Sequence, residues 1–204
     1  MRNVGGKYNR LPTMKENLIK HIERFIIVSE DLKIRLSEIS KLQSLEKGKY
    51  LHKPNKVCNY TYFINSGLVR IYYKKGDKEI TDNFSAEGEW ITSIYSFMQN
   101  VPDNCYIQTI EKSELISIDI LKLEKCFLDF PEMERFGRML ISKYFIEQSE
   151  RIISLQFHNS KERYAFFFKT AKNKIQRVPL GMLASHLGMT QETLSRVRAG
   201  KSSF

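Results

Sequence analysis

Four polar residues near the C-terminus have the types and spacing needed to read the edges of DNA bases. From Val178 to Arg198 apolar residues recur at a helical period, which leaves Gln191, Glu192, Ser195 and Arg196 on the outward face of a short helix. Amide, carboxylate, hydroxyl and guanidinium groups are the types that hydrogen-bond to base edges in the major groove. This face predicts a helix that enters the groove of duplex DNA.

Two short helices are expected to position that face. Ala184 is small where the helices would cross, and Gly188 supplies the positive φ that ends the first helix. Pro179 suits the first turn of the first helix, and Thr190 is the expected N-cap of the second. The pattern predicts a helix-turn-helix, with an ordinary corner between two helices as the alternative. The inward apolar positions are Leu183, Leu187, Met189, Leu194 and Val197.

Positive charge is concentrated in the same part of the chain. The net charge of the 204 residues is +10, and residues 157–204 carry nine lysines and arginines against two glutamates. A basic segment of this kind favours a phosphate backbone, because each neutralised phosphate releases condensed counterions. A solvated basic surface is the alternative.

Cysteine and histidine usage argues against a metal centre, a cofactor and an enzyme. Three cysteines are far apart, with no CxxC motif and no recognisable Cys/His cluster, so we expect reduced thiols and no metal. A small β-barrel enzyme would need converging histidines, and the sequence has no H-x-H pair. His186 is expected on an outward position of the first motif helix. The four histidines are His21, His52, His158 and His186.

The remaining sequence divides into a leader, a β-rich domain and a long helix. Residues 1–13 are predicted to be a flexible leader, with Met14 as a candidate start, and 42% apolar residues favour a folded chain. Residues 14–130 form the predicted β domain: helices to about Leu45 come first, and short β-type segments with glycine turns follow to about Ile120. The regular spacing predicts an antiparallel β-roll or jelly roll, either a sensor with a pocket or a plain scaffold. The fold class is therefore α+β.

A helix over residues 131–157 is expected to connect the β domain to a helix-turn-helix domain at residues 158–204. One stripe of this helix has heptad-like spacing, and a second stripe consists of Met139, Ile146 and Ile153. We expect one stripe to pack on the β domain and the other on a second subunit, with a monomer core helix as the alternative. The predicted dimer seam is Ile141, Phe145, Gln148, Ile152 and Leu155.

From Met14 onward this chain resembles the Crp/Fnr family of bacterial transcription regulators. The shared order of parts is a β-roll, a long helix and a C-terminal helix-turn-helix. The chain is most similar to short, Bacteroidetes-type members. The resemblance implies a cytoplasmic DNA-binding regulator without a membrane span. The motifs that carry the resemblance are Asn65 to Arg70 (NSGLVR), Glu162 to Tyr164 (ERY), Arg177 to Pro179 (RVP) and Glu192 to Arg196 (ETLSR).

The resemblance also implies roles for individual residues. Arg196 would contact guanine O6 and N7, Glu192 would accept from cytosine N4, and Ser195 would add a thymine-side contact. A TTGA-like half-site is expected, with Gln191 altering the preference at one base. A homodimer would bind an inverted repeat, and RNA polymerase is a further implied partner. A sensory or scaffolding module without DNA binding is the alternative function. The implied phosphate contacts are Thr190, Arg198 and Lys201.

The residues that bind a cyclic nucleotide in the family are not retained in this sequence. When the sequence is aligned with the family from Gly88 and Glu89, Asp103 stands at the position of the phosphate-binding arginine. Its carboxylate would repel an anion, and no neutralising charge is expected nearby. Binding of cyclic AMP in the usual mode is not expected, and an iron–sulfur sensor lacks its N-terminal cysteines. The effector is unknown, and the expected pocket favours an apolar or aromatic ligand, with plain core residues as the alternative. Its expected lining is Trp90, Ser93, Tyr95, Asp103 and Tyr106.

Overall fold

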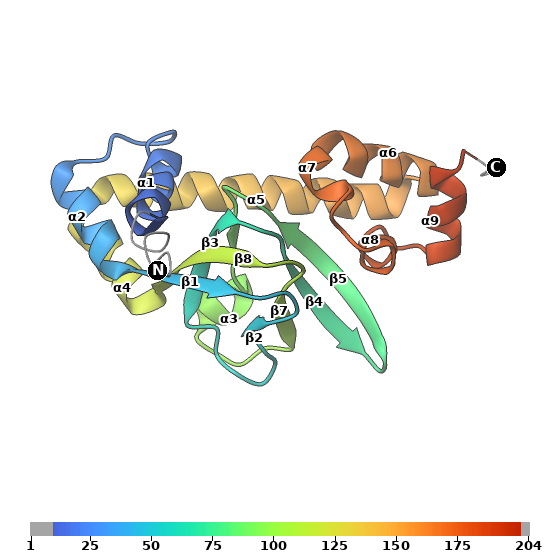
Figure 1. Cartoon of the computed structure of the whole chain (residues 1–204), viewed down its shortest axis with the longest axis horizontal. Coiled ribbons are helices and arrows are strands. Elements are labelled where there is room, and N and C mark those ends of the chain that lie inside the picture. Colours follow the sequence, from blue (N-terminus) through green and yellow to red (C-terminus); the bar gives the residue numbers. More distant parts are fainter. Residues whose placement is uncertain (1–9, 201–204) are drawn as a thin grey trace, which may run out of the picture.

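The computed structural model describes residues 10–200, which form nine helices and eight strands (Figure 1). The helices are α1 Arg10–Ile22, α2 Glu30–Ile39, α3 Ile94–Gln99, α4 Ile120–Asp129, α5 Pro131–Phe157, α6 Ser160–Thr170, α7 Lys172–Ile175, α8 Leu180–His186 and α9 Gln191–Arg198. The strands are β1 Ser40–Leu45, β2 Tyr50–His52, β3 Tyr60–Ser66, β4 Val69–Lys75, β5 Lys78–Ser85, β6 Trp90–Ile91, β7 Cys105–Thr109 and β8 Ser113–Asp119.

The strands form two antiparallel four-stranded sheets within this part of the chain. One sheet has the order β1-β8-β3-β6 and the other the order β2-β7-β4-β5. Alternate side chains of facing strands point between the sheets, because successive residues of a strand lie on opposite faces. Ile64, Val69, Ile107 and Leu115 are buried in this inner core. The predicted antiparallel β-roll and the α+β class are confirmed.

The outer face of the first sheet is covered by helices from both ends of the β-roll. Phe63, Trp90 and Ile116 pack against a cluster that includes Leu32 of α2 and Phe136 of α5. Strand β8 is therefore buried on both faces. This arrangement leaves α1, α2 and α4 at one end of α5 and the C-terminal helices at its other end (Figure 1).

The predicted helices and strands of residues 1–130 were wrong at three places. Helix α1 begins at Arg10, inside the predicted leader 1–13, while residues 1–9 lie outside the described residues. Residues 40–45 form strand β1 rather than helix, because Leu42 pairs with Ile116 at the edge of the first sheet. Helix α4 was not predicted, although Asp119 caps it by accepting from the backbone N–H groups of Leu121 and Lys122.

The C-terminal helices share an apolar cluster with the β-roll. Phe84 and Ile110 of the β-roll belong to the same buried cluster as Phe167, Leu183 and Leu194 of the helices. Side chains of this size contribute about 1.5–3 kcal/mol each when fully buried. The predicted boundary at residue 158 is thus a change of helix direction at the capping box of Asn159, and the division into domains stays a prediction.

We expect Gly67→Ala to lower the free energy of unfolding by more than about 2 kcal/mol, since an added Cβ meets backbone as well as an unfavourable φ. Gly67 has φ +104°, and its Cβ would lie 2.7 Å from the Lys112 carbonyl oxygen and from Ser113 Cα. Gly76→Ala is the matched control, because Gly76 has φ +60° with open space around it, and should cost only about 1–2 kcal/mol. Urea denaturation measures both values, and equal losses would contradict the steric explanation.

Candidate nucleic-acid interface and β-roll site

Helices α8 and α9 form the compact pair that the sequence predicted. Leu183 and Leu194 are fully buried between them, and Gly188 has φ +63° in the connection. The Thr190 side chain caps α9 by accepting from the Thr193 backbone N–H at 3.1 Å. Pro179 is the N-cap of α8 rather than a residue of its first turn. The fold of the pair follows from local signals alone.

The four predicted base-reading residues are all exposed on α9. Arg196 and Glu192 form an ion pair one helical turn apart, so each neutralises the other in the free protein. Gln191 lies against α8, where an added Cβ on Gly181 would come within 2.7 Å of its Nε2 atom. Ser195 is exposed beside Arg196. The arrangement presents donors and acceptors on one edge of the helix.

The predicted phosphate contacts are only partly described. Thr190 and Arg198 are exposed at opposite ends of α9, which suits groups that fix a helix against a backbone. Lys201 lies outside the described residues. These roles remain predictions.

Helix α8 is docked on strand β5 of the β-roll. The Ser185 hydroxyl donates to the Glu79 carbonyl at 2.8 Å and accepts from the Thr81 backbone N–H at 2.9 Å. One side chain thus extends the hydrogen bonding of an edge strand, a connection between residues more than 100 positions apart. The sequence analysis missed Ser185, since nothing local marks its partner.

Charged side chains fasten the segment before α8 to the β-roll. Arg177 pairs with Glu87 and Glu111, and Lys174 Nζ lies 2.6 Å from Glu89. Burial alone would raise the pKa of Glu87, but hydrogen bonds from Arg177 outweigh it and lower the pKa. Two of the lysines and arginines in the basic segment are therefore used within the chain. Glu89 is held by Lys174.

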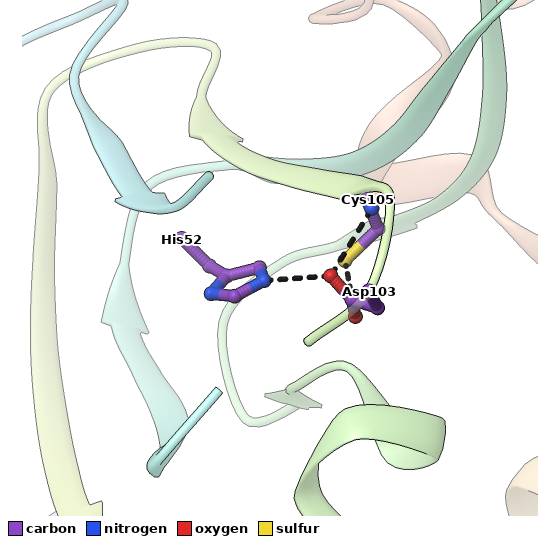
Figure 2. Close-up of side chains that lie close together, drawn as sticks. All are labelled: His52, Asp103 and Cys105. Atoms are coloured by element: carbon purple, nitrogen blue, oxygen red, sulfur yellow. Dashed lines mark hydrogen bonds and ion pairs between the residues drawn. The ribbon is translucent and has the colours of Figure 1, made fainter. Parts of the chain in front are cut away.

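A second polar site lies inside the β-roll, where the sequence predicted no cluster of cysteine and histidine. His52 Nε2 is 2.8 Å from Asp103 Oδ1, and Cys105 Sγ is 3.2 Å from Asp103 Oδ2 (Figure 2). The Ser93 hydroxyl also donates to Asp103. The side chains of His52 and Asp103 are only 5% and 7% exposed. That prediction was wrong because the β2 and β7 strands bring together residues far apart in sequence.

The pKa values of this site follow from its hydrogen bonds. Burial alone would lower the pKa of His52, but hydrogen bonds with Cys105, Cys58 and Asp103 raise it to about 11. Burial opposes ionisation of Asp103, yet hydrogen bonds from Ser93 and His52 lower its pKa. The Cys58 pKa is also lowered, mainly by His52 against the effect of burial. The Asp103 charge is therefore neutralised by His52, contrary to expectation.

The predicted effector pocket forms only in part. Trp90, Ser93 and Tyr95 line one groove of about 1060 Å³, and Asp103 and Tyr106 are outside its lining. Ser93 donates to Asp103, while the Trp90 ring packs with Phe63 at a ring distance of 5.3 Å. Tyr95 is largely exposed, and Tyr106 lies on the outer face of its sheet. Tyr106 neighbours Cys105 on one strand, and the strand alternation turns their side chains to opposite faces.

Helix α5 uses a different face toward the β-roll than predicted. The Tyr144 hydroxyl bonds to the backbone N–H and carbonyl of Trp90, at 2.8 and 3.0 Å, and the predicted second stripe is not buried there. Of the predicted seam, Gln148 is half-buried and bonds to Asp82 of β5, and Leu155 is half-buried close to Gly188 in the connection between α8 and α9. Ile141, Phe145 and Ile152 remain exposed.

These features together define a fold built from a β-roll, a long helix and a C-terminal helix pair. Residues 42–129 match the cyclic nucleotide-binding domain family. FixK2 from Bradyrhizobium japonicum has a similar structure, with a TM-score of 0.71 at 16% identity over 79% of this chain and 84% of that one. A protein described as a Crp/Fnr family transcriptional regulator from Eubacterium rectale superposes with a TM-score of 0.66 at 18% identity, over 84% of this chain and 82% of that one.

A curated relative agrees with the structural neighbours. The anaerobic regulatory protein of Pasteurella multocida is 23% identical over 172 residues, which cover 78% of this chain. The match spans 62% of that relative's own length. The predicted resemblance is confirmed: the chain contains a cyclic nucleotide-binding domain and has the fold of Crp/Fnr family regulators. Among the described residues no helix is long and apolar enough to cross a membrane.

His186 provides a test of how α8 is docked. It is buried between Phe84 and Phe167 rather than outward, and burial lowers its pKa to about 3. His186 of the unfolded chain binds a proton near pH 6.5, whereas His186 of the folded chain does not. The free energy of unfolding is therefore undiminished above pH 6.5 and decreases as the pH drops toward 3. Through His186 this decrease is about 1.4 kcal/mol per pH unit between pH 6 and 4, and we expect His186→Phe to abolish it. Urea denaturation across that range checks it, and an unchanged slope would mean that His186 is protonated in the fold.

Proposed function

We propose that this protein is a sequence-specific DNA-binding transcription regulator that acts as a homodimer on an inverted repeat. The observation that carries the proposal is the exposed edge of α9, where Gln191, Glu192, Ser195 and Arg196 stand together on a helix fixed from behind by buried leucines. A recognition helix needs this combination of a rigid inner face and polar groups free to reach base edges. The similarity in fold to Crp/Fnr regulators supports the same reading.

The ion pair on α9 is consistent with base reading. Arg196 and Glu192 satisfy each other in solution, and in a groove they would separate so that Arg196 contacts guanine and Glu192 contacts cytosine. An exposed i,i+4 pair is worth only about 0.3–0.5 kcal/mol, so its opening costs little. A TTGA-like half-site is the proposed target, with Thr190, Arg198 and Lys201 on phosphates.

A dimer along α5 is supported by the apolar residues that this helix leaves uncovered. Phe145 is 72% exposed, and Ile146, Ile152 and Ile153 are each about half exposed in the single chain. A groove of about 1060 Å³ between α5 and the rest of the fold includes Phe145 in its lining. Contiguous exposed apolar residues of this kind mark association surfaces. A second α5 packed there would bring two α9 helices into one assembly.

The β-roll is the proposed sensory part, without cyclic nucleotide in the usual mode. Glu89 is engaged with Lys174, and Asp103 is engaged with His52 inside the roll. Each carboxylate has a basic partner within the chain. RNA polymerase contact and cytoplasmic location belong to the same proposal.

Arg196→Ala is expected to weaken binding to the preferred duplex by roughly 1–3 kcal/mol while leaving binding to other sequences unchanged. The preferred duplex is first selected from random DNA with the wild-type chain, which also reports half-site and symmetry. Arg198→Ala is the matched control, because an exposed phosphate contact should weaken binding to all sequences alike. Fluorescence anisotropy at fixed salt measures each affinity. Failure of the wild type to prefer any duplex would favour a module that does not bind DNA.

Ile152→Asp is expected to convert the dimer to a monomer, since a carboxylate buried in an apolar seam without a partner costs several kcal/mol. Ile152 is 52% exposed in the single chain, and Ile34 of α2 is 58% exposed and serves as the matched site. Ile34→Asp should leave the dimer intact. Light scattering after size-exclusion chromatography measures the mass. A monomeric wild type, or equal effects of both substitutions, would refute association through α5.

A further inference from the structure

The buried cluster in the β-roll has the composition of a transition-metal site. Within the described residues, the donor atoms of His52, Asp103 and Cys105 all lie within 4.8 Å of one another. One nitrogen, one carboxylate oxygen and one sulfur come from two strand ends and the loop before β7 (Figure 2). Imidazole, carboxylate and thiolate are the ligands that Zn²⁺ takes in proteins.

The spacing of these donors is close to that of a coordination sphere. Ligand atoms at about 2.0–2.3 Å from one tetrahedral ion are separated by about 3.2–3.8 Å. His52 Nε2 lies 2.8 Å from Asp103 Oδ1, and Cys105 Sγ lies 3.2 Å from Asp103 Oδ2, so the two contacts use different oxygens of one carboxylate. Side-chain rotations that bring the three ligand atoms, all within 4.8 Å of one another, to tetrahedral separations would admit an ion.

Cys58 lies outside this group. Its sulfur contacts the Tyr60 carbonyl and the Thr92 hydroxyl at 3.5 Å each. It does not belong to the set of donors that lie within 4.8 Å of one another. Three protein donors leave the fourth position of a tetrahedral ion to a water molecule.

The outer shell and the access route also fit a metal. Asp103 accepts from the Ser93 hydroxyl and from the Cys105 backbone N–H, and such bonds orient a carboxylate ligand. A pocket of about 370 Å³ has His52 in its lining, so it approaches the cluster at this ligand.

We propose that His52, Asp103 and Cys105 bind one thiophilic divalent transition-metal ion, with water in the fourth position and Zn²⁺ as the reference ion. Binding would release the Cys105 thiol proton and the proton that His52 shares with Asp103, and it would replace the His52 contact with Asp103 by two bonds to the metal. This assignment revises the expectation of a chain without metal. It does not depend on DNA binding, and none of its readouts involves DNA.

The test uses the full untagged chain, reduced and freed of metal with a chelator, and then titrated with Co²⁺. We expect one Co²⁺ per chain with a thiolate charge-transfer absorption, displaced by Zn²⁺. Cys105→Ser should lose the absorption and bind at least about 100-fold more weakly. Cys126→Ser is the matched control, because Cys126 is buried in the separate cluster beneath the N-terminal helices and should bind as the wild type does.

A second measurement needs no variant. Zn²⁺ should protect Cys105 of the wild-type chain from alkylation while leaving the rate at Cys126 unchanged, as followed by mass spectrometry. Absence of Co²⁺ absorption together with equal alkylation rates in the presence and absence of Zn²⁺ would overturn the proposal. Loss of the absorption in Cys126→Ser, with circular dichroism like that of the wild type, would overturn the assignment of ligands.

Discussion

The packing of the C-terminal helices against the β-roll is the constraint on which the arrangement of this chain depends. Phe84 of β5 is fully buried against Phe167 and His186, so α6 and α8 cannot turn relative to the sheet without exposing aromatic surface. Ser185 adds two hydrogen bonds to β5 at the edge of the same contact. The direction in which α9 presents its polar edge is therefore set by the sheet and not by a flexible linker.

The same packing gives Glu89 a structural partner. Lys174 and Arg177 lie at the rim of the shared core, and their partners are carboxylates of the β-roll, Glu89 among them. A carboxylate at 2.6 Å from a lysine contributes to the docking of the helices. Asp103 is paired inside the β-roll instead, with His52. The two carboxylates thus have separate structural partners.

Sequence reasoning succeeded where the signal is local. Gly188 and Thr190 determine their own turn and cap, and the glycine-punctuated strands were predicted within a few residues. Prediction from the sequence failed where two residues or strands that contact each other are distant in the chain. The β1 segment is a strand only because β8 offers it an edge, and the distance between His52 and Asp103 depends on the pairing of β2 with β7. A heptad pattern on α5 likewise could not show which face Tyr144 would anchor.

The second sheet connects the buried cluster to the helix pair without any side-chain relay. His52 ends β2, Cys105 begins β7, and the hydrogen-bonded order β2-β7-β4-β5 leads from them to the strand on which α8 is docked. Strand β4 is paired with β7 along five residues and with β5 along seven, and a shift of one of these strands against the next would break a row of hydrogen bonds. Strand β2 is paired with β7 at two residues. The strand that begins at Cys105 and the strand on which Ser185 is docked therefore belong to one hydrogen-bonded sheet.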